Sequence, residues 1–174
     1  MKISVNDLVV KAVATALRAH PEVNVSYGGD KLIRHRRVHV GVAVALPDGL
    51  IVPVIRDADT LTVTQISAQT RDLATRARAG KLKPDEFTGS TFSVSNLGMF
   101  GVDQFTAVIN PPEAAILAVG ATKQEPVVRD GVLAVGYTMR VTLSVDHRAL
   151  DGATAAKFLA DLTALLENPL ATLA

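Results

Sequence analysis

Apolar residues recur every three to four positions in three segments, the spacing that places them on one face of an α-helix. The first segment, Val5–Ala19, lies between an N-capping Ser4 and Pro21, which cannot continue a helix. The pattern therefore predicts three helices. The other two are Thr64–Ala79 and Ala153–Glu167.

Seven shorter stretches are rich in β-branched residues, and several alternate apolar with polar or small positions, as strands do. The turn sequences Gly28-Gly29-Asp30 and Pro47-Asp48-Gly49 join the first four stretches into two hairpins. Strands and helices interleave without a linker or repeat, so we expect one α/β domain with a mixed sheet packed against helices. The predicted strands are Val23–Tyr27, Lys31–Ile33, Val38–Val44, Leu50–Ile55, Phe92–Ser95, Ala114–Val119 and Thr138–Val145.

Composition narrows the classes of function. Hydrophobic residues make up 48% of the 174 positions, enough for a folded core. Eighteen basic and seventeen acidic side chains leave a formal charge of +1, and aromatic residues reach only 4%, so we expect no nucleic-acid partner. The absence of cysteine excludes disulfides, thiolate metal sites and a protein thiol nucleophile. No apolar run approaches the ~18 residues of a membrane helix, so we expect no membrane partner.

The stretch Asp146-His147-Arg148-Ala149-Leu150-Asp151-Gly152 stands where a predicted strand ends and a helix begins. Strand ends in α/β folds display functional loops. His147, with Asp151 four residues later, fits a general base that is held by a carboxylate. A turn histidine followed by an N-cap fits equally well, and spacing alone leaves both interpretations open.

A second candidate stretch runs from Gly89 to Gly101. Here a strand carries Ser93, Ser95 and Asn96 into a glycine-rich loop, where a ligand can approach the backbone closely. Ser95 could donate a hydrogen bond to a developing oxyanion, and Ser93 shares its face by the two-residue period. An ordinary serine at a strand end is the alternative.

Other chemistries find less support. Ser95, His147 and Asp151 could form a serine-hydrolase triad, but no Gly-x-Ser-x-Gly elbow is present. None of the four histidines forms a metal-binding pattern on a predicted helix, and His35 and His39 flank two arginines that would repel a cation, so we expect no metal. A basic segment is either a solvated face or a site for an anionic ligand or partner. Its side chains are Lys31, Arg34, Arg36 and Arg37.

Five further segments complete a set of motifs that also includes the two stretches above. They are Lys2–Asp7, Pro21–Asn24, Gly49–Ile55, Ala79–Leu82 and Ile109–Ala114. This set, which covers essentially the whole chain, resembles the catalytic domain of the dihydrolipoamide acyltransferases of 2-oxoacid dehydrogenase complexes. The sequence from Ser95 to Gly101 is most similar to that of the pyruvate dehydrogenase, acetyl-transferring members.

The resemblance implies the two-layer fold of chloramphenicol acetyltransferase, assembled as a trimer with active sites between subunits. It implies His147 as the general base, Ser95 as an oxyanion donor from the neighbouring subunit, and Asp151 as the residue that holds the histidine loop. The expected residues for binding of substrate and coenzyme A are Ser93, Asn96, Asn110 and Pro111.

In the resembling enzymes, a thiol of dihydrolipoamide, or of coenzyme A in the reverse direction, attacks a thioester carbonyl. A thiol with a pKa of about 8.5 is mostly protonated at pH 7, so an imidazole with an ordinary pKa of about 6.5 is a well-matched base. Both thiols belong to substrates. A chain without cysteine can therefore carry out this chemistry, and the coenzyme A and lipoyl groups take part as substrates without a metal.

The resemblance also implies a larger assembly. We expect a homotrimer, with cages built from trimers through Leu170–Ala174, together with the decarboxylase and dihydrolipoamide dehydrogenase components, in the bacterial cytoplasm or the mitochondrial matrix. Residues 1–174 would form the acyltransferase domain without its N-terminal part, the lipoyl domain or the peripheral-subunit-binding domain. The alternatives are a catalytically silent core or partner-binding homologue and an enzyme for succinyl or branched-chain acyl groups.

Overall fold

The computed structural model of the chain describes residues 3–172, so the last two residues of the segment Leu170–Ala174 lie outside the described part. Three helices are present, and the first has the predicted bounds. None of the helices within residues 3–172 is long and apolar enough to cross a membrane. The helices are α1 (Val5–Ala19), α2 (Val63–Arg78) and α3 (Gly152–Glu167), with 3-10 helices at Pro84–Glu86, Gly98–Phe100 and Pro169–Thr172.

Five of the strands form a central mixed sheet in the order β11-β8-β7-β3-β6. The three central strands run parallel, whereas the edge strands β11 and β6 run antiparallel to their neighbours. The strands of this sheet are β3 (Val40–Val42), β6 (Val54–Ile55), β7 (Phe92–Asn96), β8 (Ala115–Val119) and β11 (Val141–Val145). The remaining strands form three hairpins, β1 (Val25–Tyr27) with β2 (Leu32–Arg34), β4 (Val44–Leu46) with β5 (Gly49–Ile51), and β9 (Lys123–Arg129) with β10 (Val132–Thr138).

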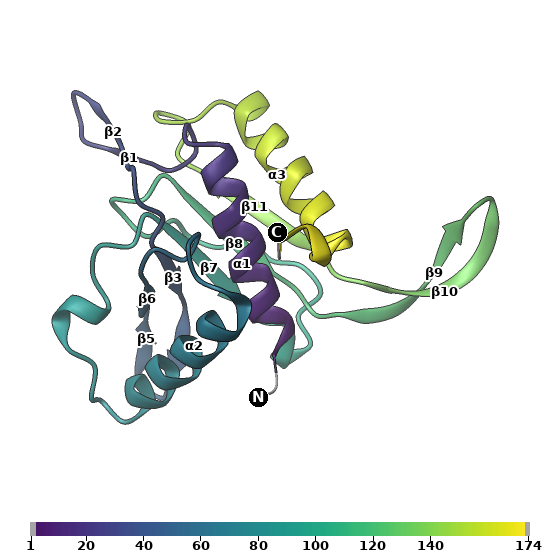
Figure 1. The fold of residues 1–174 in the computed structure, drawn as a ribbon, viewed down its shortest axis with the longest axis horizontal. Helices are drawn as coiled ribbons and strands as arrows, with labels where there is room; N and C mark the ends of the chain where they lie inside the picture. The colour runs from purple at the N-terminus through teal and green to yellow at the C-terminus, as the bar shows by residue number, and fades with distance from the viewer. Residues whose placement is uncertain (1–2, 173–174) are drawn as a thin grey trace.

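The helices pack on one face of the central sheet, with α1 and α3 side by side (Figure 1). Alternation along β7 sends Phe92 and Val94, both fully buried, into the core on the helical side. There the Phe92 ring lies 5.7 Å from the ring of Phe158 in α3. Ser93 and Ser95 therefore point to the opposite face. The predicted mixed sheet packed against helices is confirmed.

Two predicted strands are divided in the structure. The stretch Val38–Val44 becomes β3 and β4, and the stretch Leu50–Ile55 becomes β5 and β6. Pro53 lies at the second break, where it has no N–H to donate but accepts a hydrogen bond from the Val42 N–H at 2.9 Å. The predicted hairpin around Pro47-Asp48-Gly49 is present, as β4 and β5.

The β9–β10 hairpin was not predicted, and it projects from the body of the molecule as a long arm (Figure 1). The predicted strand Thr138–Val145 is wrong at its start, because Thr138 ends β10 and β11 begins at Val141. The arm packs on no core, and five of its large apolar side chains are between 67% and 74% exposed. They are Val128, Val132, Leu133, Val135 and Tyr137.

A histidine joins the ends of α1 and α3. His20 caps α1, and its ring lies 2.6 Å from the Asp161 carboxylate and 3.2 Å from that of Glu22. Burial by itself would lower the pKa of His20, but the hydrogen bonds with Asp161 and Glu22 outweigh it, and the pKa is raised. When it is protonated, the imidazole thus ties the two helices together.

We expect His20→Gln to lower the free energy of unfolding by about 1 kcal/mol at pH 6 and by clearly less at pH 9. A raised folded-state pKa means that the contribution of His20 is complete below its ordinary pKa and disappears as the pH rises through the raised value. Denaturant unfolding at both pH values measures the difference. Asp161→Asn should add little to His20→Gln, and equal losses at the two pH values would contradict this role.

Candidate functional site

His147 lies in a tight turn at one end of the central sheet. Asp146 continues β11, because its N–H donates to the Ala114 carbonyl at 2.8 Å, level with the start of β8. The Asp146 carbonyl then accepts from the N–H groups of Ala149 and Leu150. The turn leaves the side chain of His147 exposed, with Leu150 buried beneath it. A substrate can therefore reach the imidazole from solvent.

Arg148 fixes this turn against the β1–β2 hairpin. Its guanidinium donates to both oxygens of the Asp146 carboxylate, at 2.7 Å to Oδ2, and stands 4.1 Å from the centre of the Tyr27 ring. The hydrogen bonds from Arg148 lower the pKa of Asp146. The backbone on either side of His147 is thus held by a charged pair and an aromatic ring.

Asp151 caps helix α3. Its Oδ1 accepts from the Thr154 N–H at 2.8 Å, and its Oδ2 accepts from the Thr154 hydroxyl at 3.1 Å. These hydrogen bonds, led by that of the backbone N–H, lower the pKa of Asp151, with a small contribution from the charge of His147. No hydrogen bond joins Asp151 to His147 within residues 3–172. The carboxylate holds the start of α3, directly after the histidine turn.

Ser95 and Asn96 lie at the opposite end of the sheet, at the carboxyl end of β7. The Asn96 side chain accepts from the Gly98 N–H at 2.9 Å and donates to Asn6 at 3.0 Å, which ties this end to α1. Ser95 and Asn96 line an apolar pocket of about 360 Å³. Its wall includes the exposed side chains Leu50, Met99 and Phe100.

The registers of the strands show how far apart Ser95 and His147 are. Ser95 pairs with Ala118 of β8, while Asp146 lies level with Ala114, four residues earlier. At a rise of about 3.3 Å per residue, four residues separate the two levels by about 13 Å along the strand. His147 lies a residue beyond that level. One chain therefore does not bring the two side chains together, and it forms no Ser–His pair for a hydrolase triad.

Glu113 lies at the histidine end of the sheet and is only 3% exposed. Its Oε1 accepts from the hydroxyl of Ser90 and from the Asn110 amide at 3.2 Å, while its Oε2 is buried without a hydrogen-bond partner. Burial raises the pKa of Glu113, and the hydrogen bonds oppose the shift only in part. Glu113 therefore links the loop that contains Asn110 to the segment that leads into β7.

The four predicted substrate-binding residues do not form one site within the chain. Asn96 lies at the serine end, whereas Asn110 and Pro111 lie beside Glu113 at the histidine end. Ser93 lies between the two ends and is buried, and its hydroxyl makes no well-formed hydrogen bond.

Gly41 has no side chain, which leaves space for the hydroxyl of Ser93. A β-carbon at position 41 would stand 2.9 Å from the Ser93 hydroxyl oxygen and 2.7 Å from Val52. No group of three possible metal-ligating side chains is found in the described part of the chain.

Neither Glu113 nor the pair of Tyr27 and Arg148 was predicted from the sequence. A signal for Glu113 was present, since a single carboxylate directly precedes the apolar run Ala114–Val119. Such a position predicts a buried acid that needs partners from other segments. Nothing local in the sequence marks the Tyr27–Arg148 contact, because the two residues come from elements far apart in the chain.

These geometries agree with the family to which the chain belongs, that of the 2-oxoacid dehydrogenase acyltransferases. The profile described as 2-oxoacid dehydrogenases acyltransferase (catalytic domain) matches residues 1–174. A curated relative from Schizosaccharomyces pombe, a mitochondrial dihydrolipoyllysine-residue acetyltransferase component of pyruvate dehydrogenase complex, is 53% identical over 97% of this chain. The chain spans only 36% of that relative, and less than half the length of the other curated relatives compared.

Solved structures give the same result. The cubic core of a pyruvate dehydrogenase multienzyme complex is 40% identical, with a TM-score of 0.95 over 99% of this chain and 72% of the other. The dihydrolipoamide acetyltransferase of Azotobacter vinelandii is 39% identical, with the same TM-score and coverage. A chloramphenicol acetyltransferase is 14% identical, with a TM-score of 0.61 over 94% of this chain and 78% of the other, a likeness of fold alone. The predicted family and fold class are confirmed.

We expect Glu113→Gln to be more stable than the wild type at pH 8 and to lose this advantage at pH 4. A raised folded-state pKa means that ionisation of Glu113 destabilises the native protein as the pH rises from about 4.3 through the raised value, by about 1.4 kcal/mol for each unit of pKa shift. Glutamine keeps the acceptor for Ser90 and Asn110 and does not ionise. Denaturant unfolding across this pH range measures the effect. An advantage that does not change with pH would show that the carboxyl is not buried in the neutral form.

Proposed function

We propose that this chain transfers an acetyl group between a dihydrolipoyl thiol and coenzyme A, as the acyltransferase domain of a pyruvate dehydrogenase complex. Relatives that match nearly the whole chain carry the name of that activity and complex. The observation that carries the proposal is the placement of an accessible histidine and a strand-end serine at opposite ends of one sheet. Two copies of the chain, packed end to end, then build a site that a single copy lacks.

The spacing of these residues supports their roles. In the Azotobacter vinelandii acetyltransferase, a serine, a histidine and an asparagine were investigated for their role in the catalytic mechanism, and they stand 52 and 4 positions apart. Ser95, His147 and Asp151 have the same spacing in this chain, with aspartate in place of the asparagine. We therefore assign the general base to His147, the oxyanion donor to Ser95 and the support of the histidine turn to Asp151.

The chemistry balances without a cofactor bound to the protein. His147 takes the proton from the attacking thiol, and the sulfur forms a bond to the thioester carbonyl carbon. The Ser95 hydroxyl of the neighbouring copy donates to the oxyanion of the tetrahedral intermediate. The intermediate expels the other sulfur, which receives the proton from the imidazolium. Ser93, Asn96, Asn110 and Pro111 line the approach of the two substrates in this proposal.

An oligomer is part of the proposal. The arm formed by β9 and β10 carries five large apolar side chains that are at least 67% exposed, and a surface of this kind is usually covered by a partner. A solved relative forms a cubic core. We assign the arm to contacts between copies of this chain within a trimer, on which larger cages can be built.

The partners and the cellular location of the chain follow from the same assignment. Residues 1–174 act as the catalytic domain, receive the acyl group from a lipoyl domain and work beside the decarboxylase and dihydrolipoamide dehydrogenase components. The S. pombe relative is mitochondrial and the A. vinelandii relative bacterial. We assign the chain to the mitochondrial matrix or the bacterial cytoplasm.

Acetyl transfer from acetyl-coenzyme A to free dihydrolipoamide tests the assignment. We expect His147→Ala to lower kcat by about 10²–10⁴-fold and Ser95→Ala by about 10²–10³-fold. Sedimentation should give the same particle size for both variants. A His147→Ala variant that retains the wild-type rate would remove His147 from the mechanism.

Mixing the two inactive variants tests whether the site is shared. In randomly mixed cyclic assemblies, about a quarter of the sites receive an intact histidine from one copy and an intact serine from the next. We therefore expect co-expression of His147→Ala and Ser95→Ala chains to restore about a quarter of the wild-type rate. A mixture as inactive as its components would show that both residues act within one copy or that only one of them acts.

Asp151→Asn tests whether the carboxylate acts by capping α3 or by its charge. Asparagine and aspartate are about equally good N-caps, so we expect acetyl transfer to change by less than about three-fold. Asp151→Ala should lower the free energy of unfolding by about 1 kcal/mol and reduce the rate more strongly. A loss of rate in Asp151→Asn as large as that in Asp151→Ala would show that the charge is required.

A further inference from the structure

The peptide groups on both sides of His147 are fixed, each by a different part of Asp146. The peptide before His147 is held through the Asp146 carbonyl, which accepts from the N–H groups of Ala149 and Leu150 at 2.9 and 3.0 Å. The peptide after His147 is held through the N–H of Arg148, which donates to Asp146 Oδ1 at 3.0 Å. Because peptide groups are planar, the direction in which the imidazole leaves the backbone depends on where the Asp146 carboxylate stands.

The guanidinium of Arg148 holds that carboxylate. Its Nε donates to Oδ1 of Asp146 at 3.0 Å and its Nη2 to Oδ2 at 2.7 Å, the forked geometry in which arginine binds a carboxylate most tightly. The Asp146 side chain is 17% exposed, whereas that of Arg148 is 65% exposed. An exposed arginine loses side-chain entropy when it keeps one geometry, so a contact that limits its movement strengthens the pair.

Tyr27 provides that contact. The centre of its ring lies 4.1 Å from the guanidinium carbon of Arg148, an arrangement in which the ring attracts the cation. Tyr27 is the last residue of β1, far from the histidine turn in the sequence. The β1–β2 hairpin therefore orients a side chain of the turn.

Backbone hydrogen bonds set the distance between Tyr27 and the turn. The carbonyl of Ala114 accepts from the Asp146 N–H at 2.8 Å, and the N–H of Ala114 donates to the Val25 carbonyl at 3.1 Å. Ala114 thus lies between the turn and β1 and is bonded to both. The Tyr27 ring and the guanidinium are placed by backbone that a change of rotamer does not move.

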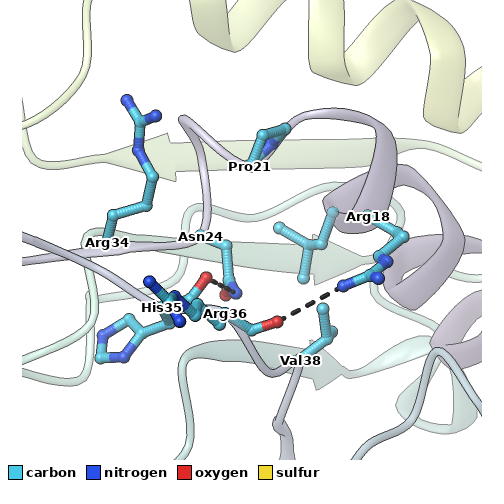
Figure 2. Close-up of a pocket in the computed structure, with 8 residues that line it drawn as sticks. Arg18, Pro21, Asn24, Arg34, His35, Arg36 and Val38 are labelled. Atoms are coloured by element: carbon cyan, nitrogen blue, oxygen red, sulfur yellow. Dashed lines mark hydrogen bonds between the residues drawn. The ribbon is translucent and has the colours of Figure 1, made fainter.

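Asn24 anchors the base of the hairpin that carries Tyr27. It is 2% exposed, and its side-chain amide donates to the His35 carbonyl at 3.2 Å (Figure 2) and to the Arg37 carbonyl at 3.0 Å. The backbone carbonyl of Asn24 accepts from the His35 N–H at 2.9 Å. The His35 imidazole also lies 2.7 Å from the Ser26 hydroxyl. These contacts join the two ends of the hairpin and fix β1 in its register.

The catalytic imidazole itself is left free for a substrate. No hydrogen bond to its ring forms within residues 3–172, although two carboxylates lie nearby. That of Asp146 is bound by Arg148, and that of Asp151 by the start of α3. Glu22 and Arg34 share a hollow with Asp151 beside the turn. Loss of the Arg148 guanidinium would leave the Asp146 charge unpaired next to the imidazole, which favours the protonated ring and reduces the fraction of free base.

We infer that Tyr27 and Arg148 are positioning residues for His147: the Tyr27 ring orients the guanidinium, and the guanidinium holds the carboxylate that fixes the backbone of the general base. The inference rests on the proposed function for the reaction that His147 performs. It gives neither positioning residue a contact with substrate. Loss of either one should therefore slow the chemical step and leave the binding of both substrates unchanged.

The kinetics of acetyl transfer test this role. We expect Tyr27→Leu to lower kcat by about two- to five-fold, as for the loss of an exposed cation–π contact. Arg148→Gln should lower kcat by about ten-fold or more, because it also removes charge-assisted hydrogen bonds. KM for both substrates should stay within about two-fold of the wild type. Tyr27→Phe keeps the ring and should keep the wild-type kcat. A raised KM for coenzyme A at unchanged kcat would show that Arg148 contacts substrate, and would overturn the inference.

The double variant Tyr27→Leu/Arg148→Gln separates positioning from a general loss of stability. Because Tyr27 acts through Arg148, we expect the double variant to have the kcat of Arg148→Gln alone, whereas independent losses would multiply. Arg37→Gln is the matched control. Arg37 binds both oxygens of the Asp57 carboxylate and is 64% exposed, but it precedes β3, which β7 and β8 separate from β11. Multiplied losses, or an equal loss in Arg37→Gln, would overturn the inference and leave the proposed function standing.

Reaction of His147 with diethyl pyrocarbonate, followed by peptide mass spectrometry, gives a readout that needs no acyl transfer. The reagent attacks the neutral imidazole, so its rate rises as the ring loses its proton. We expect Arg148→Gln to move the midpoint of this rise upward by roughly half a pH unit, and Asp146→Asn in the same variant to reverse the change. An unmoved midpoint would overturn the inference. A wild type that transfers no acetyl group, with the midpoint moved in Arg148→Gln, would overturn the proposed function and keep the positioning of His147.

Discussion

The direction of β11 relative to β7 determines where chemistry can take place in this protein. Both strands border β8, but β7 runs parallel to it and β11 antiparallel, so their carboxyl ends lie at opposite ends of the sheet. The residues that follow each strand are presented at its own end. His147 and Ser95 are therefore separated by backbone hydrogen bonding, and no rotation of their side chains can bring them together. In the proposed reaction, a second copy therefore has to supply the serine.

The two faces of the central sheet differ in what packs on them. On the helical face, Phe92 and Val94 pack into the core below α3. On the other face, small residues and Ile116 form a row across four strands, which Val54 of β6 continues. The row runs Ser144, Ile116, Ser93 and Gly41. Phe105, Ala107 and Ile109 pack on Ile116 and Ala118 of this face, so a segment of the same chain covers it beside Ser93 and Ser95.

Much of the fold could be predicted from the sequence, because local signals and burial agree. For α1, the Ser4 cap, the apolar stripe and Pro21 all point to the same bounds, and the cap forms with Asp7 as its partner. The β9–β10 arm was missed because most of its apolar side chains are exposed, and because Pro126, in the middle of β9, argues against a strand in the sequence. The break at Pro53 was also missed. The run from Leu50 to Ile55 is rich in β-branched residues, so it gives no sign that β5 and β6 belong to different sheets.

For the candidate site, the sequence could name candidate residues but not their geometry. The motifs indicate His147, Asp151 and Ser95 as candidate residues. Spacing along the chain carries no information on the direction of the strands, and it is this direction that separates the levels of Ser95 and Asp146 by about 13 Å along the sheet. Glu113 depends on Ser90 and Asn110, which meet only after the β7 and β8 segments are aligned. In the basic segment, Arg37 pairs with Asp57 and Arg34 faces Glu22, and both contacts form only in the folded chain. Which basic side chains of this segment are neutralised therefore depends on tertiary contacts that the sequence does not show.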